Sequence, residues 1–190
     1  ASIGTAARTV EALGSLLVEH AEVSRTLRAF GAALLDELAR ERRQLWEGGA
    51  PPATVPSLLE RMRGAGGARR RLCELAAFCR ARRREGPLAA AAPSAPADGG
   101  GENAAATAAS RLLDSLVRRC HEHEAAASPP PLRQMWLRLL SAPMLSYVRA
   151  LGPWLSAGRL DDPAGELPVC AGRDVAHWEG AHRLRPAVAA

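Results

Sequence analysis

Two short acidic and histidine-containing stretches carry side chains that could do chemistry. The sequence CHEHE at residues 120–124 gathers thiol, imidazole and carboxylate groups, the side chains that bind zinc. Zinc-binding histidines on a helix are usually four residues apart, whereas His121 and His123 are two apart and point to different faces. We therefore expect no metal here and interpret the stretch as a polar helix end that leads into a loop.

The second stretch, LGPWLSAGRLDDPAGEL at residues 151–167, contains three carboxylates that could act as general acids or bases: Asp161, Asp162 and Glu166. Such catalysis needs a nucleophile or a base beside them in a pocket, and no other polar cluster of the sequence supplies one. The sequence also lacks a phosphate-binding glycine loop and a Ser/His/Asp order. We expect no catalytic residue, no cofactor and no enzymatic activity.

A mechanical role explains the same stretch better. Gly158 allows the chain to leave a helix with positive φ, and Leu160 anchors the segment that follows. Asp162 precedes Pro163 in a turn, where a carboxylate can accept hydrogen bonds from backbone N–H groups. The stretch is thus predicted to be an ordered corner.

The basic residues are all arginine, and they give the chain a net charge of +5. Arginines at residues 69–71 and 80–84 could hold nucleic acid or an acidic protein. Nucleic-acid modules usually add aromatic side chains for base stacking, and Phe78 alone makes no such platform. A basic helical adaptor therefore remains the alternative function, and nucleic acid is disfavoured.

Composition predicts a helical protein. Of the 190 residues, 47% are apolar but only 4% are aromatic, so the core must consist mainly of Leu, Ala and Val, which favours helices over strands. The four cysteines show no disulfide pattern, so we expect reduced thiols in a cytosolic protein. No apolar run is long enough to span a membrane, and a start at Ala1 suggests a piece of a longer protein.

Apolar spacing places the helices. Residues 5–43 repeat apolar positions every three or four residues, which predicts one helix or two that meet near residues 20–24. A second helical stretch begins near Pro56 and resumes, after several glycines, through residues 72–78.

The C-terminal half continues in the same way. Helical pattern returns at Ala104 and runs to about residue 124, where SPPP at 128–131 breaks it. Two further helices of about ten to fifteen residues are expected on either side of Pro143. No strand is expected.

These predictions give an all-α fold of helical bundles stacked in an elongated array. Residues 1–85 form an N-terminal helical bundle, and residues 104–190 form a second helical part. Between them, residues 86–103 are rich in Pro, Ala and Gly and cannot bury enough surface to offset their ordering entropy. We expect this segment to be a disordered insertion.

A set of residues in the C-terminal half forms a motif: Trp136, Pro143, Tyr147, Leu151, Trp154, Gly158, Leu160, Asp161, Asp162, Pro163, Glu166, Trp178, Leu184 and Arg185. The motif resembles the N-terminal GRIP region of the gamma-tubulin complex components, in which a PY…L..W…G.L.DPYGEF.I pattern closes a helical bundle and a W…Y.LR element follows. The YGEF of that pattern is AGEL here, which suggests a divergent, larger member.

The resemblance implies a scaffold. In the family this domain makes lateral contacts between neighbouring components, and the resulting ring templates microtubule nucleation at centrosomes and spindle poles in the cytoplasm. The implied partners are therefore other gamma-tubulin complex components. A separate C-terminal GRIP domain, which this sequence lacks, holds gamma-tubulin.

The resemblance also implies roles for individual residues. Trp136, Tyr147, Leu151 and Trp154 would form a core between the last two helices, and the two aspartates would fix the loop. Long amphipathic helices offer grooves to a partner, so the lateral interface is predicted on the N-terminal helix face. The sequence leaves open which apolar face points inward. The candidate interface residues are Val10, Leu13, Leu17, Val23, Leu27, Phe30 and Leu34.

Overall fold

The computed structural model describes residues 2–19, 24–47, 54–56, 60, 67–84, 101–172 and 181–184. Their elements, in chain order, are the helices α1 (Ile3–Glu19), α2 (Arg25–Glu47), α4 (Ala68–Arg84), α5 (Gly101–Ala125) and α6 (Pro130–Ala157), followed by the short strands β1 (Val169–Ala171) and β2 (His182–Leu184). The predicted all-α class is confirmed for the bulk of the fold.

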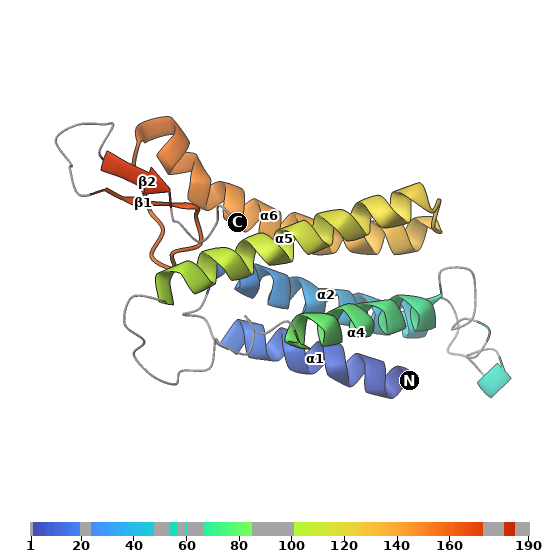
Figure 1. Ribbon diagram of the computed structural model, residues 1–190. Coiled ribbons are helices and arrows are strands. Elements are labelled where there is room, and N and C mark those ends of the chain that lie inside the picture. The colour runs from blue at the N-terminus through green and yellow to red at the C-terminus, as the bar shows by residue number, and fades with distance from the viewer. Residues whose placement is uncertain are drawn as a thin grey trace.

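The helices lie side by side in one bundle (Figure 1). Helix α2 runs through the middle and packs against α1 on one side and α6 on the other, while α4 covers α1 and α5 covers α6. The last part of α6 turns away from α5, and the two-stranded sheet lies beside it. This arrangement brings the segment between α6 and β1 next to the beginning of α2.

One hydrophobic core joins all five helices. From the sequence we divided the chain into a part before and a part after residues 86–103. Side chains from both parts contribute to this core, so the two parts share a single core. Phe78 is at its centre, because its ring packs edge-on against Phe30 at 6.1 Å and against Trp136 at 5.3 Å between centroids. These three rings therefore connect α2, α4 and α6 directly.

Serines begin the first two helices. The Ser24 hydroxyl accepts a hydrogen bond from the backbone N–H of Leu27 at 3.0 Å, and Ser2 caps α1 through the N–H of Thr5 at 3.2 Å. A serine oxygen satisfies one of the N–H groups that lack a partner within the first turn of a helix. Of the two arrangements left open for residues 5–43, the structure has two helices.

Glycines allow α1 and α2 to approach closely. A Cβ added at Gly31 would lie 2.7 Å from the Cβ of Leu17 and 2.9 Å from the backbone oxygen of Gly14. Neither of these atoms can move away easily, since one belongs to the backbone and the other is attached to it. The close crossing of the two helices thus requires a residue without a side chain at Gly31.

The second half of the chain differs from the prediction in three ways. Pro143 does not separate two helices but lies buried inside the single helix α6, which also contains Pro153. A proline removes only one helical hydrogen bond, and Gly152 lacks the Cβ that would collide with the ring of Pro153. Two proline positions can therefore be tolerated where tertiary packing holds the helix.

The other two differences concern a helix start and a sheet. Helix α5 begins at Gly101, three residues before the expected start, because no proline after Pro96 stops it; the rest of the predicted insertion lies outside the described residues. Strands β1 and β2 pair antiparallel, with Val169 opposite Leu184. Each has three residues, too few for an alternating pattern to reveal.

Candidate functional site

The acidic corner begins where α6 ends. Gly158 has a φ of 63° and its N–H donates to the carbonyl of Trp154 at 3.0 Å, a left-handed cap of the kind that glycine favours. A turn then follows, in which the N–H of Gly165 donates to the backbone oxygen of Asp162 at 3.1 Å. Aspartate, proline and glycine stand at the first, second and fourth positions of this turn, which are the positions where a type I turn favours them.

The side chain of Asp162 holds this turn. Its two carboxylate oxygens accept hydrogen bonds from the backbone N–H groups of Glu166 and Leu167, each at 2.8 Å. Asp161, the neighbouring aspartate, is exposed, as is Pro163. The predicted mechanical role is therefore visible for Asp162, and the sequence did not distinguish the two aspartates.

Glu166 caps α2 from the far end of the chain. Its carboxylate is 2% exposed and accepts hydrogen bonds from the backbone N–H groups of Arg25 and Thr26, the latter at 3.0 Å, and from the Thr26 hydroxyl. The positive end of the helix dipole favours an anion at this place. The sequence motif includes Glu166 but gave no indication of this partner.

The aromatic residues of the motif do not form the single core that we predicted. Trp136 is fully buried, but Tyr147, Leu151 and Trp154 are only half-buried, because the helices expected to pack together are one continuous helix. Trp154 packs instead edge-on against His182 of β2 at 6.0 Å.

Tyr147 lies close to the acidic corner. Burial raises the pKa of its hydroxyl, and the negative charges of Asp162 and Glu166 raise it further. The phenol therefore stays protonated and neutral beside the carboxylates. Leu160 is half-buried in the same corner, and Leu184 is exposed on β2, whereas Trp178 and Arg185 lie outside the described residues.

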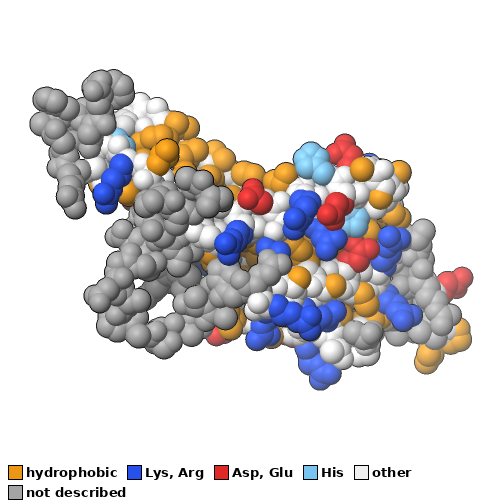
Figure 2. Space-filling model, in the orientation of Figure 1, with side chains coloured by type: hydrophobic (Ala, Val, Ile, Leu, Met, Phe, Trp, Pro, Cys, Tyr) orange, Lys and Arg blue, Asp and Glu red, His pale blue; other side chains and the backbone are white. Residues whose placement is uncertain are grey.

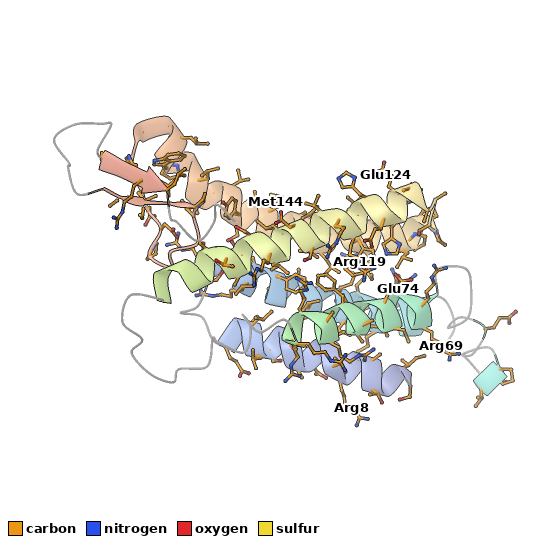
Figure 3. The ribbon with its side chains drawn as sticks, in the orientation of Figure 1. Arg8, Arg69, Glu74, Arg119, Glu124 and Met144 are labelled. Carbon is orange, nitrogen blue, oxygen red and sulfur yellow. The ribbon has the colours of Figure 1, made fainter. Side chains whose placement is uncertain are left out.

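The histidines at the end of α5 have separate surroundings. His123 stacks on Trp136 with 5.8 Å between ring centroids, its Nδ1 lies 3.0 Å from the Ser128 hydroxyl, and its Nε2 lies 3.2 Å from Glu74. Figure 3 shows Glu74 on α4, facing the end of α5. His121 is exposed. Within the described part of the chain, no three His, Cys, Asp or Glu side chains come together as metal ligands.

The structure contradicts the predicted lateral interface. Six of its seven residues fill the core, and each is at most 5% exposed: Val10, Leu13, Leu17, Leu27, Phe30 and Leu34. The seventh, Val23, lies outside the described residues. The correction has a simple cause, since α1 and α2 bury these side chains against each other and against α4 and α6.

Two ion pairs made by buried glutamates of α2 were missed. Glu41 forms a two-pronged pair with Arg71 of α4, with Nη2 2.7 Å from Oε2, and Glu37 forms one with Arg138 of α6, with distances of 2.6 and 2.9 Å. Both glutamates are at most 3% exposed. The sequence held a signal, because Glu37 and Glu41 continue the three-and-four spacing of the buried Leu34 and therefore had to face the core.

An apolar groove of about 310 Å³ lies between α1, α2 and α4. Most of its lining is aliphatic, and the charged residues that line it include Glu41, which is already paired with Arg71. Chemistry in a pocket needs convergent polar groups that are free to act on a ligand. The groove therefore has a shape and a lining that suit an apolar group, and we assign no chemistry to it.

The arginines are spread over the surface with acidic residues among them (Figure 2). Arg82 is anchored, since its Nη1 donates to the Ser115 hydroxyl at 2.7 Å and its guanidinium lies 5.6 Å from the centre of the Phe78 ring. On the same helix α4, Arg69, Arg83 and Arg84 are exposed. Arg8 of α1 points away from the bundle (Figure 3).

Comparisons of the chain with family models, with curated proteins and with solved structures found no match. Among the described helices, none is both long enough and apolar enough to cross a membrane. Of the three carboxylates of the acidic corner that could have done chemistry, those of Asp162 and Glu166 accept hydrogen bonds from backbone N–H groups, and Asp161 is exposed.

Proposed function

We propose that this chain is a scaffold domain without enzymatic activity, belonging to a gamma-tubulin complex component. It would contact neighbouring components side by side, so that their ring templates microtubule nucleation. The observation that carries the proposal is the engagement of Asp162 and Glu166 with backbone N–H groups. Carboxylates held in this way stabilise a corner and a helix end, which is what an architectural motif requires.

The residues that resemble the family support the same proposal. Trp136 supplies a ring to the core, Gly158 ends α6, and Glu166 caps α2, so each of the three has a structural role. Because the N-terminal helix face is buried, the contact with a neighbour belongs on another surface. Gamma-tubulin itself would bind elsewhere in the complete component.

The experiment is a pairwise binding test with purified N-terminal regions of other gamma-tubulin complex components. We expect a complex of this chain with at least one of them in sedimentation velocity, and none with isolated gamma-tubulin. Failure to associate with any family member, or direct binding of gamma-tubulin, would contradict the proposal. A chain unfolded by urea serves as the control for unspecific association.

A basic adaptor is the second candidate, favoured by the exposed Arg69, Arg83 and Arg84 on α4. It predicts binding to heparin or RNA with an affinity that falls steeply and linearly on a log–log plot against salt. Reversing the charge of these three residues would abolish that binding. The scaffold proposal expects no such salt-dependent retention at physiological ionic strength.

A further inference from the structure

Helix α6 has a second apolar face that the described part of the chain leaves largely uncovered. Its apolar members lie seven residues apart at first and three or four apart from Leu145 onwards, and the exposed Ser141 stands in the first interval: Leu137, Met144, Leu145, Val148, Leu151 and Leu155. We call this set the outward face of α6. Leu137, Val148 and Leu155 are 56%, 51% and 68% exposed, and the other three are exposed or half-buried.

The outward face lies opposite the face that α6 buries in the bundle. At about 100° per residue, Leu137, Val148 and Leu155 fall within a narrow strip along the helix. The buried Leu139 and Ala150 project from the other side. Figure 3 places Met144 at the edge of the bundle far from α1 and α4, and Figure 2 shows hydrophobic side chains gathered along that edge.

An amphipathic helix at a surface normally presents polar residues to water, so a strip that is apolar apart from Ser141 marks a binding surface. The strip runs from Leu137 to Leu155, which corresponds to about 27 Å of helix at 1.5 Å per residue. This length suits a partner helix that packs alongside, with side chains at matching three-and-four spacing.

Charge identifies the kind of partner. Helix α6 contains three arginines and no acidic residue. Arg138 is paired with Glu37, whereas Arg133 and Arg149 are exposed and make no ion pair with a residue that the structure describes. A second copy of the chain that paired through the same face would bring arginines against arginines, and like charges at an interface oppose association.

We propose that the outward face of α6 binds an amphipathic helix of a different protein, with apolar residues at three-and-four spacing and flanking Asp or Glu. This inference deepens the proposed function, on which it rests for the identity of the partner as a neighbouring component. It also replaces the buried N-terminal helix face as the place of the lateral contact.

The test uses two designed helical peptides of about 20 residues, a length that matches Leu137 to Leu155. They share one apolar strip and carry either Glu or Lys beside it. We expect the Glu peptide to bind this chain, by fluorescence anisotropy, at least about tenfold more tightly than the Lys peptide. Equal binding of the two peptides would overturn the proposal.

Variants locate the binding. The double change Val148→Glu and Leu155→Glu should weaken binding of the Glu peptide at least about tenfold, and Arg149→Glu should reduce its advantage over the Lys peptide. Val55→Glu is the matched control, because Val55 is an exposed apolar residue outside α6. Circular dichroism checks that all variants keep their helices. Unchanged binding in the double variant would overturn the proposal.

Two other binding partners of the outward face, a second copy of the chain and a lipid surface, would be recognised by two further measurements. A dimer of this chain in sedimentation equilibrium that Val148→Glu disperses would show a second copy on the outward face. Vesicles of phosphatidylserine and phosphatidylcholine that displace the Glu peptide would show a lipid surface there. Either result overturns the proposal.

The same variants separate this inference from the proposed function. If a neighbouring component binds the wild-type chain and the double variant equally well, the outward face is not the contact, although the scaffold function stands. If the Glu peptide binds through the outward face and no component binds the chain, the proposed scaffold function is wrong. The outward face is then still a binding site for an acidic amphipathic helix.

Discussion

The carboxylate of Glu166 lies 3.0 Å from the backbone nitrogen of Thr26, although 140 residues separate the two in the chain. The contact is buried, and it supplies an anion to the positive end of α2. Ser24 caps the same helix from its own segment. Helix α2, which contacts both sides of the bundle, thus has its start fixed by one local acceptor, Ser24, and one remote acceptor, Glu166.

Glu166→Ala should destabilise the fold by about 1.5–3 kcal/mol, the usual loss for hydrogen bonds to a charged acceptor. Glu166→Gln should cost less, since its amide keeps one acceptor oxygen. Urea unfolding followed by circular dichroism measures both, and we expect a lower midpoint with an unchanged slope. Equal stability of the alanine variant and the wild type would show that the cap contributes nothing.

The two aspartates of the corner should differ sharply. Asp162→Asn replaces one of two acceptor oxygens and should destabilise by about 1 kcal/mol. Asp161→Asn, at an exposed position, should stay within about 0.5 kcal/mol of the wild type. Thermal unfolding of the matched pair checks this. A larger loss for Asp161→Asn would contradict the assignment of the turn to Asp162.

Breaking the buried pair of α2 and α4 should be costly. Glu41→Ala leaves the guanidinium of Arg71 buried without its main partner, which destabilises by about 3–5 kcal/mol. Glu122→Ala, which removes two exposed pairs on α5, those with Arg118 and Arg119, should cost about 1 kcal/mol or less. The double change Glu41→Leu and Arg71→Met should recover most of the loss, because no charge is then buried alone. Denaturant unfolding of all variants decides the point.

The helix crossing at Gly31 should not tolerate a methyl group. Gly31→Ala gains about 1 kcal/mol of helix propensity, but overpacking against Leu17 and Gly14 costs about 1–3 kcal/mol, so a net loss is expected. At Gly4, where an added Cβ meets nothing within 4 Å, the same change should not destabilise. We expect a lower unfolding midpoint for Gly31→Ala than for Gly4→Ala. Equal midpoints would show that the crossing of α1 and α2 has room for a methyl group.

Burial raises the pKa of the Cys79 thiol to about 12 from its ordinary 9.0. The unfolded thiol therefore ionises first as the pH rises, so the stability held below pH 9 falls as the pH increases towards 12. At about pH 8 the thiol should react with a thiol reagent only after unfolding. Cys79→Ala should flatten the pH dependence of stability above about pH 9. Rapid labelling of Cys79 in the folded chain would contradict this account.

Most helices could be predicted because their apolar spacing records the face that they bury. The same spacing misled us about the interface, since a strip such as Val10 to Leu34 looks alike whether it faces a core or a neighbour. Only the packing of α2 between α1 and α6 distinguishes the two cases. The continuous helix α6 was missed because the cost of Pro143 is offset by tertiary contacts, which sequence does not show.

The site was predictable in kind but not in its partners. The sequence indicated a turn at Asp162 and Pro163, because these residue types act through local hydrogen bonds. The contact of Glu166 with Thr26 could not be found, since its two members are remote in sequence. Arg138 and Glu37, which also form a pair, are 101 residues apart in the sequence.

The cap on α2 has a consequence for the order in which the chain can mature. Translation proceeds at about 5–20 residues per second, so Glu166 is made about 7–28 s after Thr26. Until then the start of α2 is capped by Ser24 alone. The backbone N–H groups of Arg25 and Thr26 can meanwhile form hydrogen bonds with water or with a chaperone. A nascent chain stopped before residue 166 would therefore contain all five described helices but lack the remote cap on α2, which is added only when the acidic corner has been synthesised.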